Sequence, residues 1–227
     1  MHIHTYISKT GYCSRRETIR LLKAERITVN GEICASNQQV DEGDDVRIDG
    51  HPLPIIKKFV YLILNKPRGI ICTSQQNIEN NIIDFVGYPE RIFAIGRLDK
   101  ESEGLILLSN DGSIVNPLMK TEHAKEKEYV VTVDRPVTDQ LIEGIREGGI
   151  DIKGKKTSPC TVEQLSETAF RIILTQGLNR QIRRMCRTFG FTVQSLKRVR
   201  IMDIYLNDLP IGKWRHLSDA EVKQLKR

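Results

Sequence analysis

The sequence lacks any hydrophobic run long enough to cross a membrane. A transmembrane helix needs about 18 consecutive apolar residues, and the longest runs here are short, such as residues 60–64. The first residues, MHIHTYISKTG, show neither the apolar core nor the small-residue cleavage site of a signal peptide. The sequence therefore predicts a protein with no membrane partner.

Cysteines are few and scattered. The five cysteines are odd in number and none forms a CxxC pair, which argues against both a zinc ribbon and a disulfide framework. A reducing compartment is the simplest environment for such thiols, so we expect a cytoplasmic protein.

The usual signatures of nucleotide and metal chemistry are also missing. Residues 149–156 nearly spell a phosphate-binding loop, but they end in Lys156 where that loop needs a Ser or Thr hydroxyl to hold magnesium. We interpret this segment as a charged turn. The five histidines form no HExxH pattern, so the sequence shows no apparatus of a metal hydrolase.

What the sequence does contain is an uneven distribution of charge. The 227 residues include 35 Lys and Arg against 29 Asp and Glu, a net charge of +6. Residues 168–202 hold eight basic residues and no acidic one, and residues 9–26 hold six basic residues against Glu17 and Glu25. A charge run is usually a solvated face, but two separate basic segments favour a nucleic-acid partner.

The first fifty residues resemble a small docking module. Ser14-Arg-Arg-Glu17 predicts a capping box, with a helix to about Ala24 whose inner face carries Ile19 and Leu22. Asn30-Gly31 between two short apolar segments predicts a tight hairpin, because both residues tolerate a positive φ. We therefore expect a domain at residues 1–50 and, because of two prolines, a linker at residues 51–58.

The remainder, residues 59–227, alternates short strands and helices without a strict βαβ rhythm. This pattern predicts an α+β domain with a largely antiparallel mixed sheet. The expected strands are residues 59–64, 70–72, 91–95, 105–109, 129–133, 169–174, 193–199 and 214–217. The expected helices are residues 114–119, 138–147, 180–189 and 218–226, the last opening with a second capping box.

One segment places an acid where catalytic groups tend to lie. An apolar strand leads into Gly96-Arg97-Leu98-Asp99, and a second apolar strand begins after Gly104. Asp99 is thus expected on a loop between two buried strands. Taken alone, such an aspartate more often caps a turn.

A second segment, residues 175–189, predicts a basic helix. Ile182, Met185, Cys186 and Phe189 follow the spacing of a buried helix face. Arg180, Arg184 and Arg187 are expected on one outer face, which suits phosphates. Arg183 falls near the edge of the buried face, where an arginine needs a carboxylate partner.

These residues resemble the RsuA family of bacterial pseudouridine synthases, which join an N-terminal RNA-binding domain of the ribosomal-protein S4 type to a catalytic domain. The resemblance covers nearly the whole chain. It rests on the motifs Cys13-Ser-Arg-Arg-Glu17, Asn65-Lys-Pro-Arg-Gly69, Gly96-Arg-Leu-Asp99, Lys127-Glu-Tyr129 and Gly177-Leu-Asn-Arg-Gln-Ile-Arg-Arg-Met185. The last motif is most similar to the branch of large-subunit rRNA synthases termed F. The first five residues depart from the usual basic start.

The resemblance implies an activity and assigns roles. The family isomerises uridine to pseudouridine in structured RNA, without metal or cofactor, and its aspartate maps onto Asp99. Its arginine partner maps onto Arg183 and its stacking tyrosine onto Tyr129. We expect the pairing of Arg183 with Asp99 to keep the Asp99 carboxylate ionised. The residues expected at the RNA are Arg97, Leu98, Lys100, Asn179, Arg180, Gln181, Ile182, Arg184 and Arg187 of the catalytic domain, and Arg15, Arg16, Arg20 and Lys23 of the first domain.

The expected partner is large-subunit (23S) ribosomal RNA or its precursor, with a transfer RNA anticodon loop as a second substrate, and the expected state is a monomer. Two other readings stay open. A ribosome-assembly factor could use the first domain without catalysis, although it would have no need of Asp99. A metal-dependent nuclease would need more clustered carboxylates than Asp99 and Glu101.

Overall fold

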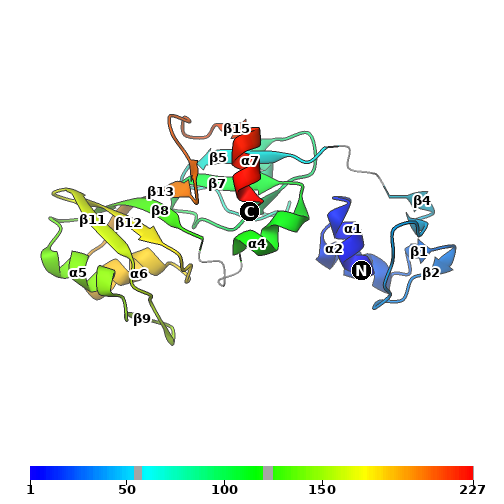
Figure 1. Ribbon diagram of the computed structural model, residues 1–227, viewed down its shortest axis with the longest axis horizontal. Helices are drawn as coiled ribbons and strands as arrows, with labels where there is room; N and C mark the ends of the chain where they lie inside the picture. The colour runs from blue at the N-terminus through cyan, green and yellow to red at the C-terminus, as the bar shows by residue number, and fades with distance from the viewer. Residues whose placement is uncertain (54–57, 120–124, 227) are drawn as a thin grey trace.

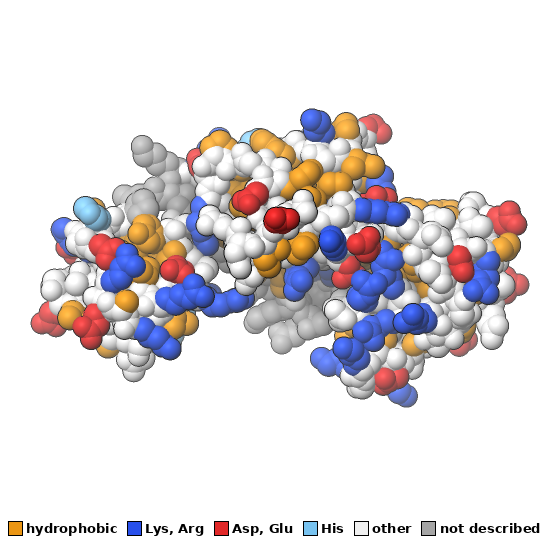
Figure 2. Space-filling view, turned by 180° about the vertical axis from the view of Figure 1, so that it is seen from behind, with side chains coloured by type: hydrophobic (Ala, Val, Ile, Leu, Met, Phe, Trp, Pro, Cys, Tyr) orange, Lys and Arg blue, Asp and Glu red, His pale blue; other side chains and the backbone are white. Residues whose placement is uncertain are grey.

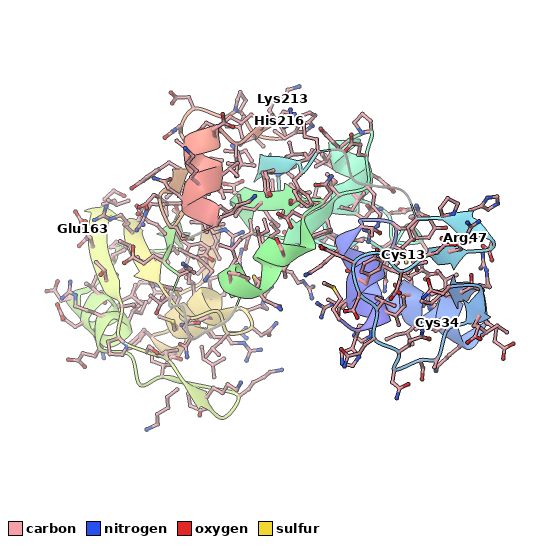
Figure 3. All side chains as sticks on the ribbon, turned by 45° about the vertical axis from the view of Figure 1, so that its right-hand side comes forward. Cys13, Cys34, Arg47, Glu163, Lys213 and His216 are labelled. Atoms are coloured by element: carbon pink, nitrogen blue, oxygen red, sulfur yellow. The ribbon has the colours of Figure 1, made fainter. Side chains whose placement is uncertain are left out.

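The computed structural model describes residues 1–53, 58–119 and 125–226. Its long axis runs from a small N-terminal unit, blue in Figure 1, to a yellow lobe at the other end. Arg47 of the N-terminal unit and Glu163 of the far lobe mark these two ends in Figure 3. One large sheet occupies the middle and the far lobe.

The N-terminal unit is two helices packed on a four-stranded sheet. Its elements are α1 (Ile3–Lys9), α2 (Arg15–Lys23), β1 (Ile27–Val29), β2 (Glu32–Ile33), β3 (Val46–Ile48) and β4 (His51–Pro52), with the sheet in the order β2-β1-β3-β4. A core of its own includes Ile3, Ile7 and Ile27, all fully buried. The expected hairpin is present, with Asn30 and Gly31 both at positive φ.

Three expectations for this unit need correction. The inner face of α2 carries Leu21 and Leu22, while Ile19 is 44% exposed. Ser14 accepts from the Glu17 amide, but the Glu17 carboxylate pairs with Arg20 at 3.1 Å and does not complete a capping box. The linker is shorter than expected at its start, because residues 51–52 pair with β3 as a strand; residues 54–57 lie outside the described part.

The large sheet has nine strands and is mixed, as expected. Its order is β11-β12-β8-β13-β7-β5-β15, with β14 beside β13 and β6 beside β7. Every pairing is antiparallel except that of β13 with β7. The strands are β5 (Tyr61–Lys66), β6 (Phe93–Ile95), β7 (Glu103–Ser109), β8 (Lys127–Val133), β11 (Thr161–Ser166), β12 (Ala169–Leu174), β13 (Val193–Ile201), β14 (Ile204–Tyr205) and β15 (Trp214–His216).

Short helices cover this sheet. They are α3 (Ile82–Val86), a 3₁₀ turn (Gly112–Ile114) leading into α4 (Val115–Met119), α5 (Asp139–Glu147), α6 (Gln181–Thr188) and α7 (Asp219–Leu225). The second capping box is confirmed at Ser218 and Glu221, where α7 begins. The near phosphate-binding segment is the expected turn, a small hairpin of β9 (Asp151–Ile152) and β10 (Lys155–Lys156).

The hydrophobic core of the large sheet consists of separate clusters, each beneath different helices. Helices α5 and α6 pack on β8 and β12 in the far lobe, burying residues such as Ile145, Met185 and Phe170 completely. In the middle, alternate residues of β5 and β7 enter two different clusters. Ile63 and Leu107 face α4 and α7, whereas Leu62 and Ile106 face α3. This period of two is what a strand covered on both faces requires.

One glycine allows the two halves of the sheet to join. Gly104 has a φ of +101°, and a Cβ built on it would lie 2.2 Å from the backbone oxygen of Arg198. Its neighbour across the parallel pairing is Arg198 itself. Only glycine fits this close approach of β7 to β13.

Candidate active site

Asp99 lies on the loop of residues 96–102, between β6 and β7. Its backbone oxygen accepts from the Ser102 amide at 3.0 Å, which closes the turn. Leu98 is buried beneath it, and its amide lies 3.4 Å from the Cys72 sulfur. The Asp99 side chain is 32% exposed. The loop therefore presents a carboxylate to solvent from a backbone anchored in the core.

Lys66 secures this loop from below. Its side chain is fully buried at the end of β5, where the ammonium donates to the carbonyls of Pro67 at 2.8 Å, Ile70 at 2.9 Å and Lys100 at 3.4 Å. The Gly69 amide donates to the same Lys100 carbonyl at 2.8 Å. Burial lowers the pKa of Lys66, and neighbouring acids of the loop, Asp99 among them, act in the opposite direction.

The charge partner of Asp99 is Arg180. The Arg180 guanidinium lies 3.8 Å from the Asp99 carboxylate, and both side chains are partly exposed. Arg180 is also the N-cap of α6, with a left-handed φ of 52°. A left-handed conformation is uncommon for a residue with a side chain, and such strain tends to gather at functional sites. This position turns Arg180 toward the loop and away from the expected outer face.

The expected ion pair between Arg183 and Asp99 is absent. Arg183 instead donates to the Glu101 carbonyl at 3.0 Å, to the Val193 carbonyl at 3.2 Å and, at 3.5 Å, to the Ser102 hydroxyl. Burial lowers the pKa of Arg183, and the neighbouring Arg180 charge acts in the same direction. Arg183 thus binds the backbone of the loop, and its one-turn displacement along the helix from Arg180 explains why it does not pair with the carboxylate.

Tyr129 contacts an arginine that the sequence analysis did not single out. Arg198 of β13 is buried, donates to the Leu105 carbonyl at 2.7 Å, and lies 3.5 Å from the Tyr129 hydroxyl with its guanidinium 5.9 Å from the ring centre. One of its nitrogens, Nη2, is buried with no hydrogen-bond partner among the described residues. The signal available in the sequence was position, because Arg198 shares the inward face of its strand with Leu196.

The remaining residues expected at the RNA divide by exposure. Leu98, Gln181 and Ile182 are buried, so their assignment as contact residues is corrected: they support the site from inside. Gln181 accepts from the Leu178 amide at 2.9 Å, which shapes the turn before α6. Arg184 is half-buried and lies 3.4 Å from Asn179. The residues that remain exposed are Arg97, Lys100, Asn179, Arg180 and Arg187.

The basic residues of α2 are exposed as well. Arg15, Arg16, Arg20 and Lys23 all lie on the surface, and only Arg20 has an acidic partner among the described residues, Glu17. Figure 2 shows Lys and Arg side chains on one face of the molecule, both over the N-terminal unit and over the other end. This face offers the positive charge that a nucleic-acid backbone requires.

Across residues 1–53, 58–119 and 125–226, no group of three His, Cys, Asp or Glu side chains is close enough to hold a metal ion. In the same residues, no helix is both long and apolar enough to cross a membrane. The groups described around this site are a positioned carboxylate, its arginine neighbours and an aromatic ring.

The chain is similar to known proteins over both of its parts. Residues 60–188 match the RNA pseudouridylate synthase family, and residues 1–46 match the S4 domain family. The dual-specificity RNA pseudouridine synthase RluF of Salmonella typhi is 45% identical over 98% of this chain and 78% of its own length. The protein of the same name from Escherichia coli K12 is 43% identical over 99% of this chain and 78% of its own length.

More distant relatives share the architecture. The ribosomal large subunit pseudouridine synthase B of Bacillus subtilis is 33% identical and covers 97% of this chain and 93% of its own. A crystal structure described as a pseudouridylate synthase superposes with a TM-score of 0.73 at 27% identity, over 99% of both chains. The likeness therefore extends over both the N-terminal unit and the large sheet.

Proposed function

Since this chain belongs to the RNA pseudouridine synthases and carries an N-terminal S4 domain, we propose that it isomerises particular uridines of 23S ribosomal RNA and of a transfer RNA anticodon loop. That it is an isomerase forming pseudouridine in RNA follows from its family. The choice of substrates is supported by relatives named for dual specificity and for the large ribosomal subunit.

The observation that carries the assignment of Asp99 is the way its loop is held. Three consecutive carbonyls, of Asp99, Lys100 and Glu101, accept hydrogen bonds from groups outside or across the turn. The backbone is thus fixed while the carboxylate stays partly exposed beside the Arg180 guanidinium. A fixed group needs little reorganisation when a substrate arrives, which is how positioned groups lower a barrier.

The reaction breaks the bond between N1 of uracil and C1′ of ribose and forms a bond between C5 and C1′. The proton on C5 is lost and N1 gains a proton, so no electrons enter or leave and no water is consumed. The Asp99 carboxylate acts as the nucleophile or as the base that removes a ribose proton, and both roles need its ionised form. The Arg180 guanidinium, 3.8 Å away, is the positive charge beside this carboxylate.

The target uridine has to leave its stack before the carboxylate can reach it. We assign Tyr129 to stack on the extruded uracil and Arg198 to hold the tyrosine ring from its buried side. Arg183 acts through the loop backbone as a positioning residue. The exposed arginines and lysines around the site and on α2 contact phosphates.

The two units of the chain have separate proposed roles. We propose that the N-terminal unit, which extends to β4 (His51–Pro52), forms the RNA-docking domain and that residues 59–227 form the catalytic domain. Substrates of this kind place the protein in the cytoplasm, where it works as a monomer.

Asp99→Asn tests the assignment, since it keeps the size of the side chain while removing the charge. We expect a folded protein that binds RNA and forms no pseudouridine. In the assay, RNA from cells that lack the protein is incubated with the purified protein, and pseudouridines are then mapped. Turnover within about tenfold of wild type, ~1.4 kcal/mol of barrier, contradicts the assignment. Asp203→Asn, an exposed acid in the turn after β13, is the matched control.

The mapping also tests the choice of substrate. New pseudouridines in 23S ribosomal RNA and in a transfer RNA anticodon loop are the expected result with wild-type protein. Modification confined to small-subunit ribosomal RNA would contradict the proposed substrates. An RNA complex that forms without any modification would mean that the chain serves as an assembly factor instead.

A further inference from the structure

A cleft of about 1020 Å³ lies between the N-terminal unit and the catalytic loop. One wall is the start of α2, with Arg16 and Arg20. The opposite wall is the loop of residues 72–77, and the floor continues through residues 94–97. We infer that this cleft binds the single-stranded nucleotides that flank the isomerised uridine, and that Gln75, Gln76 and Asn77 read their bases. The inference rests on the proposed function and adds to it the residues that select the sequence.

The cleft adjoins the loop that carries the reactive carboxylate. Gly96 and Arg97 line it, and the next two residues along the chain are Leu98 and Asp99. The second wall is tied to the same loop, since the Leu98 amide lies 3.4 Å from the sulfur of Cys72. A strand of RNA in the cleft would therefore lie next to the loop that acts on the target uridine.

A direct contact links the N-terminal wall to the segment that leads to the floor. Arg91, just before β6, donates to the Gly11 carbonyl of the N-terminal unit at 3.1 Å. Gly11 precedes α2, and Arg91 precedes the strand that leads to residues 94–97. The two units that form the cleft are thus in hydrogen-bond contact.

The chemistry of the lining fits RNA. The charged residues that line the cleft are three arginines and one acid: Arg16, Arg20, Arg97 and Glu17. The Glu17 carboxylate is already paired with Arg20. Guanidinium groups that bind phosphates position a strand without reading its sequence. The amides of Gln75, Gln76 and Asn77 are exposed and carry both donors and acceptors, which are the groups that recognise base edges.

Among the described residues that line the cleft there is no aromatic side chain. Sequence-tolerant binders of single strands stack bases on aromatic rings, whereas the described lining offers amide groups for hydrogen bonds. Recognition by hydrogen bonds leaves an unpaired amide when the wrong base enters, and the cost of that unpaired group produces discrimination. The loop of residues 74–77 is therefore a specificity element, and the arginines hold the strand in register.

The experiment uses the full chain and an RNA hairpin carrying a mapped uridine with its flanking nucleotides randomised. The variant is the triple substitution Gln75→Ala, Gln76→Ala and Asn77→Ala, and the control is Gln140→Ala, an exposed amide on α5. Single-turnover rates are measured for each flanking sequence. We expect the ratio of the rates for the best and the worst flanking sequence to fall about tenfold or more in the triple variant, mainly because the preferred sequence reacts more slowly. Gln140→Ala should leave both the ratio and the rates as in wild type.

Crosslinking gives an independent readout. With 4-thiouridine placed on each side of the target in turn, peptides spanning residues 72–77 should carry the crosslink, as mapped by mass spectrometry. Unchanged preferences in the triple variant, or crosslinks confined to other surfaces, overturn the inference. A wild-type protein that modifies no RNA overturns the proposed function instead, and the crosslinks would still show whether RNA enters the cleft. Equal unfolding temperatures exclude a collapse of the fold.

Discussion

At the scale of single residues, Arg180 and Arg183 contact the loop of Asp99, residues 96–102, in two different ways. Arg180 lies beside the carboxylate of Asp99, whereas Arg183 binds the backbone of the residues that follow it. One therefore acts on charge and the other on geometry. The two arginines lie three residues apart at the start of α6. Substitutions of each can therefore be compared directly in rate and in stability.

Arg180→Ala should slow the chemical step more than it changes stability. The pair is partly exposed at 3.8 Å, so we expect a loss of about tenfold in single-turnover rate, ~1.4 kcal/mol, and a change in unfolding free energy below ~1 kcal/mol. Arg183→Ala should instead lower the unfolding free energy by about 1–2 kcal/mol, because the loss of the charged donor leaves the partly buried Val193 carbonyl and the Glu101 carbonyl without this partner.

Rates from single turnovers and free energies from urea unfolding separate the two outcomes. Arg187→Ala, exposed on the same helix, is the control and should weaken RNA binding with near-normal chemistry. Equal effects of the Arg180 and Arg183 substitutions on both quantities would contradict this division of roles.

The sequence allowed the position of Asp99 to be predicted, but not its neighbour. Two apolar strands around Gly96 and Gly104 were enough to place the aspartate on a loop. A helical wheel, however, assigns directions only within a helix. Arg180 is the left-handed N-cap of α6, so its side chain does not follow the wheel. Arg198 was missed because a basic residue in a strand is usually assumed to face solvent.

At the scale of elements, the strands of the large sheet were the most predictable part. The strand at residues 169–174 was predicted with its observed bounds, and most of the others within two residues. The strand expected at residues 70–72 is absent, with only an isolated bridge from Ile71 to Asn81. Strand β11 was missed because it lies at the edge of the sheet with Val162 as its one buried residue.

The close approach of β7 to β13 predicts a large effect of one methyl group. Gly104→Ala would place a Cβ against the Arg198 backbone at 2.2 Å and would demand a φ of +101° from alanine. We expect a loss of about 3 kcal/mol or more in unfolding free energy, measured by urea denaturation. Gly177→Ala is the control, since nothing lies within 4 Å of its Cβ position. A Gly104→Ala protein as stable as wild type would show that the two strands can separate without cost.

The docking of α7 on β15 should depend on pH. Two hydrogen bonds from Arg215, at 2.7 and 2.8 Å, are the main reason that the pKa of Glu221 is lowered from 4.5 to about 2. Because the folded state holds the carboxylate ionised, the stabilisation is complete above pH 4.5 and is lost as the pH falls toward 2. Glu221→Gln should cost on the order of 2 kcal/mol at pH 7 after solvent screening.

Thermal or urea unfolding at pH 7 and at pH 3 measures this difference. The difference in unfolding free energy between wild type and Glu221→Gln should be smaller at pH 3 than at pH 7. Glu143→Gln removes an exposed pair with Arg146 on α5 and should change stability by less than ~0.5 kcal/mol at either pH. A gap that is independent of pH would indicate that packing, rather than charge, holds α7.

At the scale of the whole molecule, we expect the N-terminal unit to contribute to RNA binding and not to the chemical step. The basic face of α2 belongs to the N-terminal unit, and Asp99 belongs to the large sheet. Replacing Arg16, Arg20 and Lys23 together by alanine should weaken RNA binding and reduce the slope of log affinity against log salt by ~0.7–0.9 per lost phosphate contact. Turnover at saturating RNA should survive.

Filter binding across a salt series measures the slope. Arg47→Ala is the control, because Arg47 is paired with Asp45 on β3, away from α2. An unchanged slope in the triple variant would show that α2 does not contact the phosphates. A loss of turnover at saturating RNA would mean that this face also takes part in the chemical step.

The five cysteines are free, and four of them are buried, including Cys13 and Cys34 in the N-terminal unit (Figure 3). Burial raises the pKa of Cys160 to about 11 and of Cys186 to about 12, and it also raises the pKa of Cys13 and Cys34. Thiolates, which react with maleimides, are therefore scarce on these residues at neutral pH. A fluorophore attached through Ser74→Cys, on the exposed rim of the cleft, would face little competing label and would report the arrival of RNA in real time.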